Sequence, residues 1–162
     1  MSDILATLDE LGIAAETHAH PPVLTVEEAR AHWGAIDARH SKNLFLKDAG
    51  GAYWLVCMPA DATLDLKSLP ARIGSKRLRF APAEDLERLL GVQPGSVSAF
   101  AIVNDRGGAV RLVLDAALMD APRIAFHPLD NSRTTVLTPA DLRRFLASIG
   151  RGALEAALGD RA

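Results

Sequence analysis

The sequence has very little cysteine: Cys57 is the only one among 162 residues. A single thiol cannot form an internal disulfide, and Cys57 lies in the apolar run YWLVCM. We therefore predict that it is a buried core residue. A protein without disulfides suits a reducing compartment, so we expect a cytoplasmic location.

Long hydrophobic runs are also missing. No segment has the roughly 20 apolar residues that a membrane-spanning helix requires. The N-terminus, MSDILATLDELG, has neither the basic start nor the apolar stretch of a secretion signal. We expect no contact with a membrane.

The chain carries no strong excess of charge. Its 18 basic and 20 acidic residues give a formal net charge of -2. This balance provides no general attraction to a polyanion, so any contact with a nucleic acid must use a local patch. The hydrophobic fraction of 49% is typical of a globular protein with a real core.

Repeats, linkers and low-complexity tracts are absent from the sequence. Alternating apolar residues and turn residues predict three hairpins, at 42–59, 98–115 and 123–138, and separate strands at 14–20 and 76–80. Capping signals and helical spacing predict helices at 2–12, 25–34, 64–74, 81–91 and 138–150, followed by a short helical tail. We therefore predict one α+β domain over residues 1–162, with a twisted, mixed, mostly antiparallel sheet (a partial barrel) flanked by helices.

The segment HSKNLFL contains a lysine at the start of an expected strand. Strand alternation places Lys42, Leu44 and Leu46 on one face, and Asn43 and Phe45 on the other. If the leucine face packs inward, the ammonium group of Lys42 points toward the interior or a cavity. It then needs an anion, supplied by the protein or by a ligand.

Histidines are the next candidates. His18 and His20 share a face of an expected strand, but no cysteine or carboxylate stands at metal-ligand spacing, so we favour a structural role and expect no metal. His127 follows the strand RIAF and precedes a proline. Functional groups often gather where strands end, although a histidine there can simply bond to a nearby carbonyl.

Two further segments have polar or charged groups that could bind a ligand. The loop GSVSAFA contains small residues whose backbone N–H groups could hold a carbonyl or an oxyanion, or it could be a plain connection. The cluster of Lys76, Arg77 and Arg79 could contact a phosphate backbone, or it could be a solvated face paired with the acidic residues of AEDLER. The sequence contains no Gly-x-Ser-x-Gly motif.

Several stretches in this order, followed by a helix, resemble the prolyl-tRNA editing family. They are HSKNLFL, YWLVCMPAD, KRLRFA, PAEDLERLLGVQPGSVSAFAIVND and AFHPLDNSRTTVLT. This family comprises the YbaK-like, prolyl-tRNA synthetase-associated domains. The chain resembles the free-standing form that clears alanine from tRNA(Pro), over nearly its whole length.

The resemblance implies hydrolysis of the ester between a mischarged amino acid and the tRNA 3′ end, without a metal or another cofactor. The family's essential lysine corresponds to Lys42, its following asparagine to Asn43 and its late histidine to His127. The family's Gly-rich loop commonly reads Gly-x-x-x-Pro, and its last position here is Ala99. That loop corresponds to Gly95, Ser96, Val97, Ser98 and Ala99.

These expectations define a candidate mechanism. Lys42 would anchor a phosphate or stabilise the developing oxyanion, while Asn43 and the loop N–H groups would orient the ester carbonyl. His127 would bind the amino acid or ribose, or assist proton movement, and the 2′-hydroxyl of the substrate would do part of the work of a base. Val23, Phe45 and Phe100 (with Leu24) would lie near a small pocket, unless they are ordinary core residues.

The expected partners are the acceptor end of aminoacylated tRNA(Pro) and prolyl-tRNA synthetase, with no specific binding of DNA. Lys76, Arg77 and Arg79 would contact the tRNA. Two alternatives remain open at this point. One is a deacylase for Cys-tRNA(Pro) or another misacylated tRNA, and the other is a tRNA-binding module without catalytic activity.

Overall fold

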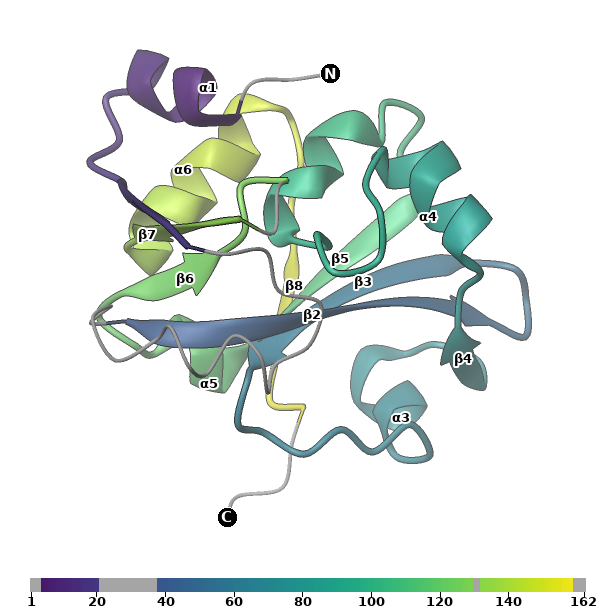
Figure 1. Ribbon diagram of the computed structural model, residues 1–162. Helices are drawn as coiled ribbons and strands as arrows, with labels where there is room; N and C mark the ends of the chain where they lie inside the picture. The colour runs from purple at the N-terminus through teal and green to yellow at the C-terminus, as the bar shows by residue number, and fades with distance from the viewer. Residues whose placement is uncertain (1–3, 21–37, 130–131, 159–162) are drawn as a thin grey trace.

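The strands in the described part of the chain form one open, mixed, eight-stranded sheet (Figure 1). The computed structural model describes residues 4–20, 38–129 and 132–158. The strand order is β1-β7-β6-β2-β3-β5-β8, and β4 pairs with β2 beside this path. The strands are β1 (Glu16–Ala19), β2 (Arg39–Asp48), β3 (Tyr53–Pro59), β4 (Leu78–Phe80), β5 (Val110–Asp115), β6 (Ile124–Phe126), β7 (Arg133–Leu137) and β8 (Leu154–Ala156).

The pairing is antiparallel for β1–β7, β2–β3, β2–β4 and β6–β7, and parallel for β2–β6, β3–β5 and β5–β8. The predicted α+β class with a mixed sheet is confirmed, and the sheet stays open without closing into a barrel.

The helices are α1 (Ile4–Glu10), α3 (Leu69–Ile73), α4 (Ala83–Leu90), the 3-10 helix η2 (Ala99–Asn104), α5 (Ala116–Met119) and α6 (Pro139–Ser148).

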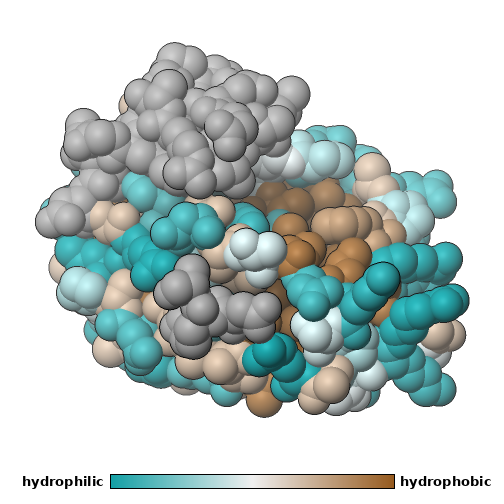
Figure 2. All heavy atoms as spheres, turned by 90° about the horizontal axis from the view of Figure 1, so that it is seen from below, coloured by the Kyte–Doolittle hydropathy of each residue, from teal (hydrophilic) through white to brown (hydrophobic). Residues whose placement is uncertain are grey.

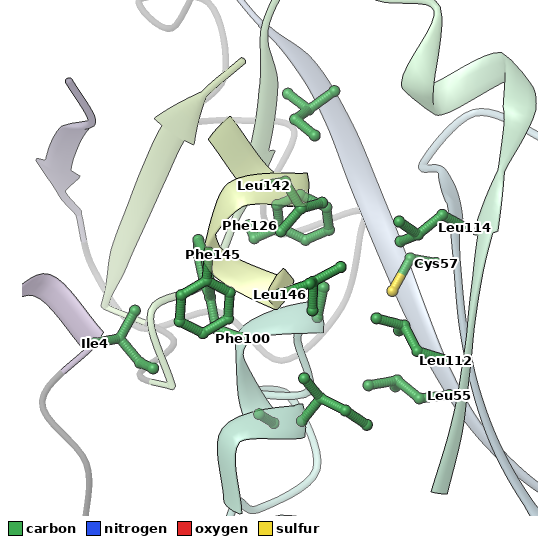
Figure 3. Close-up of a cluster of buried hydrophobic side chains, with 14 of the residues drawn as sticks. Ile4, Leu55, Cys57, Phe100, Leu112, Leu114, Phe126, Leu142, Phe145 and Leu146 are labelled. Carbon is green, nitrogen blue, oxygen red and sulfur yellow. The ribbon is translucent and has the colours of Figure 1, made fainter. Parts of the chain in front are cut away.

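The larger hydrophobic cluster lies between the sheet and the layer formed by α1, α4, η2 and α6 (Figures 1 and 3). Strands β3 and β5 present Leu55 and Leu112 to it from the sheet. At its centre the Phe100 ring contacts Phe126 and Phe145 edge-on, with centroids 5.7 Å and 5.5 Å apart. These contacts fix η2 against both α6 and the end of β6.

A smaller cluster covers the opposite face of the sheet, where α3 packs. Strand β2 contributes to both clusters, because Phe45 belongs to the larger one and Leu46 to the smaller one. Leu44 is partly buried against the smaller cluster. The predicted alternation along β2 is therefore confirmed, and Lys42 shares the face of Leu44 and Leu46.

The β2–β3 hairpin turns around Asp48, whose side chain is 6% exposed in the folded chain. One carboxylate oxygen accepts the N–H groups of Gly50 and Ala52, and the other accepts Trp54 Nε1–H and the N–H of Lys76. Burial alone would raise the pKa of this carboxyl, but these hydrogen bonds outweigh it and leave the pKa below its ordinary value. Asp48 therefore holds the hairpin tip against the segment that leads into β4.

The predicted second hairpin is wrong, because residues 99–104 form η2 and not a strand. Ser98 caps this helix by accepting the N–H of Phe100 at 3.1 Å. The run AFAIV is apolar on all sides, and such a run does not distinguish a strand from a buried helix. As a consequence, β5 pairs in parallel with β3 and with β8.

The predicted helical tail is also wrong, since residues 154–156 form β8 beside β5. The helix expected at 64–74 is shorter than predicted, because α3 begins at Leu69, with Pro70 in its first turn. Other predictions hold: Thr138 caps α6 through the N–H of Asp141, with Pro139 at the helix start. The helix expected at 25–34, Val23 and the turn residues 130 and 131 lie outside the described residues.

None of the helices in the described ranges combines the length and the apolar character needed to cross a membrane.

Replacing Asp48 by asparagine should destabilise the protein by roughly 2–4 kcal/mol, because an amide NH₂ would face the N–H donors of Trp54 and Lys76. Urea unfolding monitored by tryptophan fluorescence measures this change.

The pKa of Asp48 is lowered in the folded protein, so its carboxylate stabilises the fold at pH values above the ordinary pKa near 4. This contribution is lost as the pH falls through the folded-state pKa. D48N should therefore lose less stability than wild type on acidification. Equal acid sensitivity of both proteins would contradict the assignment.

Candidate functional site

One edge of β2 lacks a partner strand among the described residues. On this edge β6 pairs with Arg39 and His40 only, and β4 pairs from Leu46 onward. Residues 41–45 lie between these two contacts. Within the described ranges the sheet therefore has a local gap, bordered by the ends of β6 and β4.

Main-chain polar groups point into this gap. On this edge Arg39 donates its N–H to Arg123 O at 2.9 Å, and Phe45 O accepts the N–H of Ala81 at 3.0 Å. Alternate residues of a strand direct their N–H and C=O groups to the same edge, so Asn43 also presents its N–H and C=O groups to the gap. An unpaired strand edge of this kind readily hydrogen-bonds a ligand.

Lys42 stands at the gap on the face of the smaller cluster. Its side chain is half-buried, and its Nζ donates a hydrogen bond to the carbonyl oxygen of Ala62, in the loop that follows β3. The ammonium group is thus held close to the protein and does not extend into bulk solvent. A carbonyl is a neutral acceptor, and an anion would bind the ammonium more strongly.

His127 directly follows β6 and lies on the same face as Lys42. His40 pairs with Ala125 in parallel register. Lys42 and His127 each stand two positions further along, so their side chains project on the same side of the sheet. The Nδ1 atom of His127 lies 2.8 Å from the carbonyl oxygen of Arg133. Because a carbonyl only accepts, Nδ1 carries the proton, and the Nε2 of the neutral ring is an acceptor.

His20 is a second imidazole at this position, which sequence reasoning did not place beside His127. The two ring centroids are 6.0 Å apart, and His20 Nε2 lies 2.8 Å from Thr134 Oγ1. The contact depends on the pairing of β1 with β7, which are distant in sequence. The predicted shared face of His18 and His20 could not reveal this contact.

Leu129, two residues after His127, has a backbone φ of 67°, which is a strained conformation for a bulky side chain.

Asn43 projects on the opposite face, toward the larger cluster. Its Nδ2 donates to Ser41 Oγ at 3.1 Å, and that hydroxyl donates to Ala125 O at 2.7 Å. The Oδ1 atom is buried and accepts no hydrogen bond within the described ranges. Asn43 can therefore accept a hydrogen bond through Oδ1, while one of its two N–H donors is already used.

The loop of residues 95–98 is fixed over the larger cluster, where Val97 packs. Gly95 has φ of 94°, which a glycine adopts without strain, and Ser96 donates its N–H to Gln93 O at 3.0 Å. The N–H groups of Gly95, Val97 and Ser98 donate to no acceptor in the described part of the chain. Ala99 is the first residue of η2, and the first position of a helix also accepts a proline.

The expected pocket residues are mostly core. Phe100 is fully buried and Phe45 is 5% exposed, with its ring stacked on Tyr53 at 5.4 Å. Both side chains can shape a pocket only by packing behind it. Val23 lies outside the described residues.

The basic cluster lies at the other end of the gap, around β4. Lys76, Arg77 and Arg79 are exposed, and no ion pair with a described residue neutralises them. The proposed pairing with the acidic residues of α4 is not observed. Its Asp85 instead binds Tyr53, Arg88 and Lys47, and the Tyr53 hydroxyl and Arg88 hold the Asp85 pKa below its ordinary value.

A surface hollow of about 510 Å³ lies within this cluster. It is lined by Lys47, Asp48, Ala49, Gly51, Arg77, Leu78 and Arg79. Asp48 is its only carboxylate, and four hydrogen-bond donors already surround that group. The hollow is therefore suited to an anion.

No group of three potential metal ligands occurs among the histidine, cysteine and acidic residues that the structure describes. Cys57 is fully buried, and burial raises the pKa of its thiol far above the ordinary value. A thiol in this state is a poor nucleophile and a poor metal ligand. The prediction that Cys57 is a core residue is confirmed.

Comparisons with known proteins give a consistent result. The family model described as "Aminoacyl-tRNA editing domain" matches residues 20–145. The chain is 39% identical to the "Prolyl-tRNA editing protein ProX" of Acetoanaerobium sticklandii, over 91% of this chain and 90% of that protein. It is 38% identical to the "Prolyl-tRNA synthetase associated domain-containing protein 1" of Xenopus laevis, with the same coverage.

A similar solved structure supports the fold. It is a crystal structure described as that of a candidate trans-editing enzyme for prolyl tRNA synthetase, with a TM-score of 0.73. The match covers 98% of this chain and 96% of that one, at 22% sequence identity. Such a match establishes the shared architecture only.

The hydrogen bond to Arg133 O fixes the tautomer of His127, and this is testable. Neutral His127 should carry its proton on Nδ1, whereas the other tautomer is the commoner one in free histidine. Long-range ¹H–¹⁵N NMR spectra of the imidazole rings, assigned with a His127→Gln variant, distinguish the two forms. A proton on Nε2 at neutral pH would show that the hydrogen bond does not form.

Proposed function

Because this chain belongs to the aminoacyl-tRNA editing domain family, we propose that it hydrolyses the ester of a mischarged tRNA(Pro), with alanine as the preferred amino acid. The observation that carries the proposal is the placement of Lys42 and His127 on one face, at the gap in the sheet. A cytoplasmic location fits this role.

In the proposed complex the aminoacylated 3′ adenosine occupies the gap. Lys42 exchanges its bond to Ala62 O for an anion of the substrate, which is either the phosphate or the oxyanion that develops at the ester carbonyl. The first role positions the ester, and the second stabilises the transition state directly. The N–H groups of Gly95, Val97 and Ser98 orient the carbonyl.

The reaction requires water as its only co-reactant. The water oxygen attacks the ester carbon, the bond to the ribose oxygen breaks, and a proton passes to that oxygen to give free amino acid and tRNA. With Nδ1 protonated, His127 offers Nε2 as an acceptor for the attacking water or for a ribose hydroxyl. The 2′-hydroxyl of the substrate assists this proton movement, and no metal takes part.

The Asn43 amide offers the substrate both a donor and an acceptor. One of its two N–H groups is bonded to Ser41 Oγ, and the second bonds to no described acceptor, so it is proposed to orient the ester carbonyl. The buried Oδ1 requires a donor. We therefore assign Oδ1 to a substrate donor, either the ammonium group of the amino acid or a ribose hydroxyl.

Selection of alanine over proline would rest on size. A hydrophobic pocket gains only about 1–3 kcal/mol for each methylene, so a synthetase site for proline cannot strongly reject alanine. A second site that admits only the smaller residue solves this problem by exclusion. Val23 is proposed to line that pocket, with Phe45 and Phe100 as its packed support.

Lys76, Arg77 and Arg79 are proposed to bind the tRNA backbone. Their charges are not neutralised by the described residues, so a phosphate can pair with them without breaking an existing ion pair. Prolyl-tRNA synthetase is a further proposed partner, since it produces the mischarged substrate.

A panel of charged tRNAs tests the substrate assignment. Purified protein should release alanine from Ala-tRNA(Pro) faster than the amino acid from Pro-tRNA(Pro), Cys-tRNA(Pro) or Ser-tRNA. Faster hydrolysis of another ester would keep the assignment as a deacylase but change the proposed amino acid. Binding of all four tRNAs without release would indicate a silent binding module.

Lys42→Ala should lower the rate of Ala-tRNA(Pro) deacylation by on the order of 100-fold or more, because the substrate loses its counter-charge. Circular dichroism and thermal unfolding check that the fold is intact. Lys67→Ala, which removes an exposed lysine from the loop before α3, is the matched control and should keep full activity. Wild-type activity of Lys42→Ala would remove Lys42 from the mechanism.

Arg77→Ala and Arg79→Ala should each weaken tRNA binding and reduce the slope of log K against log salt by about 1. Filter binding of tRNA(Pro) from low to moderate salt measures both quantities. Arg143→Ala is the control, because Arg143 is already paired with Glu155 at 2.8 Å. Slopes that do not change in the first two variants would exclude phosphate contacts at these positions.

A further inference from the structure

Phe80 is an exposed aromatic residue at the edge of the sheet. It is 57% exposed, and among the described residues only Leu154, at 43%, is a further large hydrophobic side chain left in solvent. The two differ in chemistry, because only Phe80 has a planar π face on which another ring can stack.

The register of the sheet relates Phe80 to the proposed catalytic lysine. Phe80 pairs with Leu46 across the β2–β4 ladder, so both side chains lie on the same face of the sheet. Lys42 shares that face, four residues earlier on β2. At about 3.3 Å for each residue, the two positions are roughly 13 Å apart along the strand.

The surroundings of Phe80 favour an anionic, ring-bearing ligand. Arg79 precedes it directly, and exposed Arg77 and Lys76 lie just before β4. Partly buried Leu44, Leu64 and Leu66 pack against the smaller cluster on this face of the sheet. Figure 2, the view from below, shows hydrophobic surface bordered by hydrophilic residues.

We propose that Phe80 stacks on an unpaired base of the acceptor end, upstream of the aminoacylated adenosine. This inference rests on the proposed function, since it takes the 3′ adenosine to be at Lys42. Stacked nucleotides rise about 3.4 Å each, and an unstacked strand rises more, so a span of roughly 13 Å corresponds to at most about four nucleotide steps from the 3′ adenosine. Bases stack on aromatic side chains without strict sequence preference, while neighbouring basic residues hold the backbone.

Phe80 is thereby assigned to binding and not to the chemical step. Removing the ring should raise KM for a full tRNA and leave kcat nearly unchanged. It should have no effect on a substrate that ends before the stacked nucleotide. This separation distinguishes a stacking contact from a general loss of stability, which would lower activity on every substrate.

The experiment compares Ala-tRNA(Pro) with 2′(3′)-O-alanyl-adenosine as substrates. Phe80→Ala should lower kcat/KM for the tRNA by about 10-fold, mostly through KM, and leave alanyl-adenosine hydrolysis unchanged. Phe80→Trp should restore the tRNA value, because it keeps a stacking face. Leu154→Ala, at the exposed position on β8, should match wild type on both substrates.

A binding arm keeps the test independent of catalysis. Fluorescence anisotropy with an acceptor-stem minihelix should show that Phe80→Ala weakens binding when the unpaired 3′ end is present and not when it is removed. Equal binding and equal tRNA kinetics for Phe80→Ala and wild type would overturn the inference, as would equal losses on both substrates. Failure of wild type to hydrolyse either ester would overturn the proposed function, and the binding arm would still decide the role of Phe80.

Discussion

One strand, β2, is hydrogen-bonded into both halves of the sheet, and the whole candidate site depends on this pairing. Its first residues join β6 and its last residues join β4, while its middle pairs only with β3 among the residues that the structure describes. The alternation of a single continuous strand then determines that Lys42 faces one way and Asn43 the other. A shift of register by one residue would exchange these two side chains and bury the charged one against the larger cluster.

The distribution of charge matters more than its total. The chain is slightly acidic overall, yet around β4 its basic side chains outnumber the carboxylates that could neutralise them. Asp48, which lines the hollow, is surrounded by N–H donors, and Asp85 of α4 is engaged by Tyr53 and Arg88. A polyanion approaching from other directions meets no general attraction, so the local field can orient it toward the gap in the sheet.

Local signals in the sequence predicted much of this fold. The hairpin around Asp48 and the capped α6 follow from turn and capping residues, and the alternation at Lys42 follows from strand geometry. Contacts between distant segments could not be predicted in this way. The strand β8, the neighbouring positions of His20 and His127, and the gap in β2 all arise from pairing between remote parts of the chain. The strand prediction for residues 99–104 was wrong for another reason. A uniformly hydrophobic run has no periodicity that distinguishes a strand from a helix.

The edge strand β8 gives the fold a late-forming element. It pairs in parallel with β5, and Leu158 just beyond it is buried in the cluster that also holds Leu46 and Trp54. During synthesis, that cluster stays incomplete until residue 158 has emerged from the ribosome. The face of the sheet that carries Lys42 is therefore completed only after the other described strands have been synthesised.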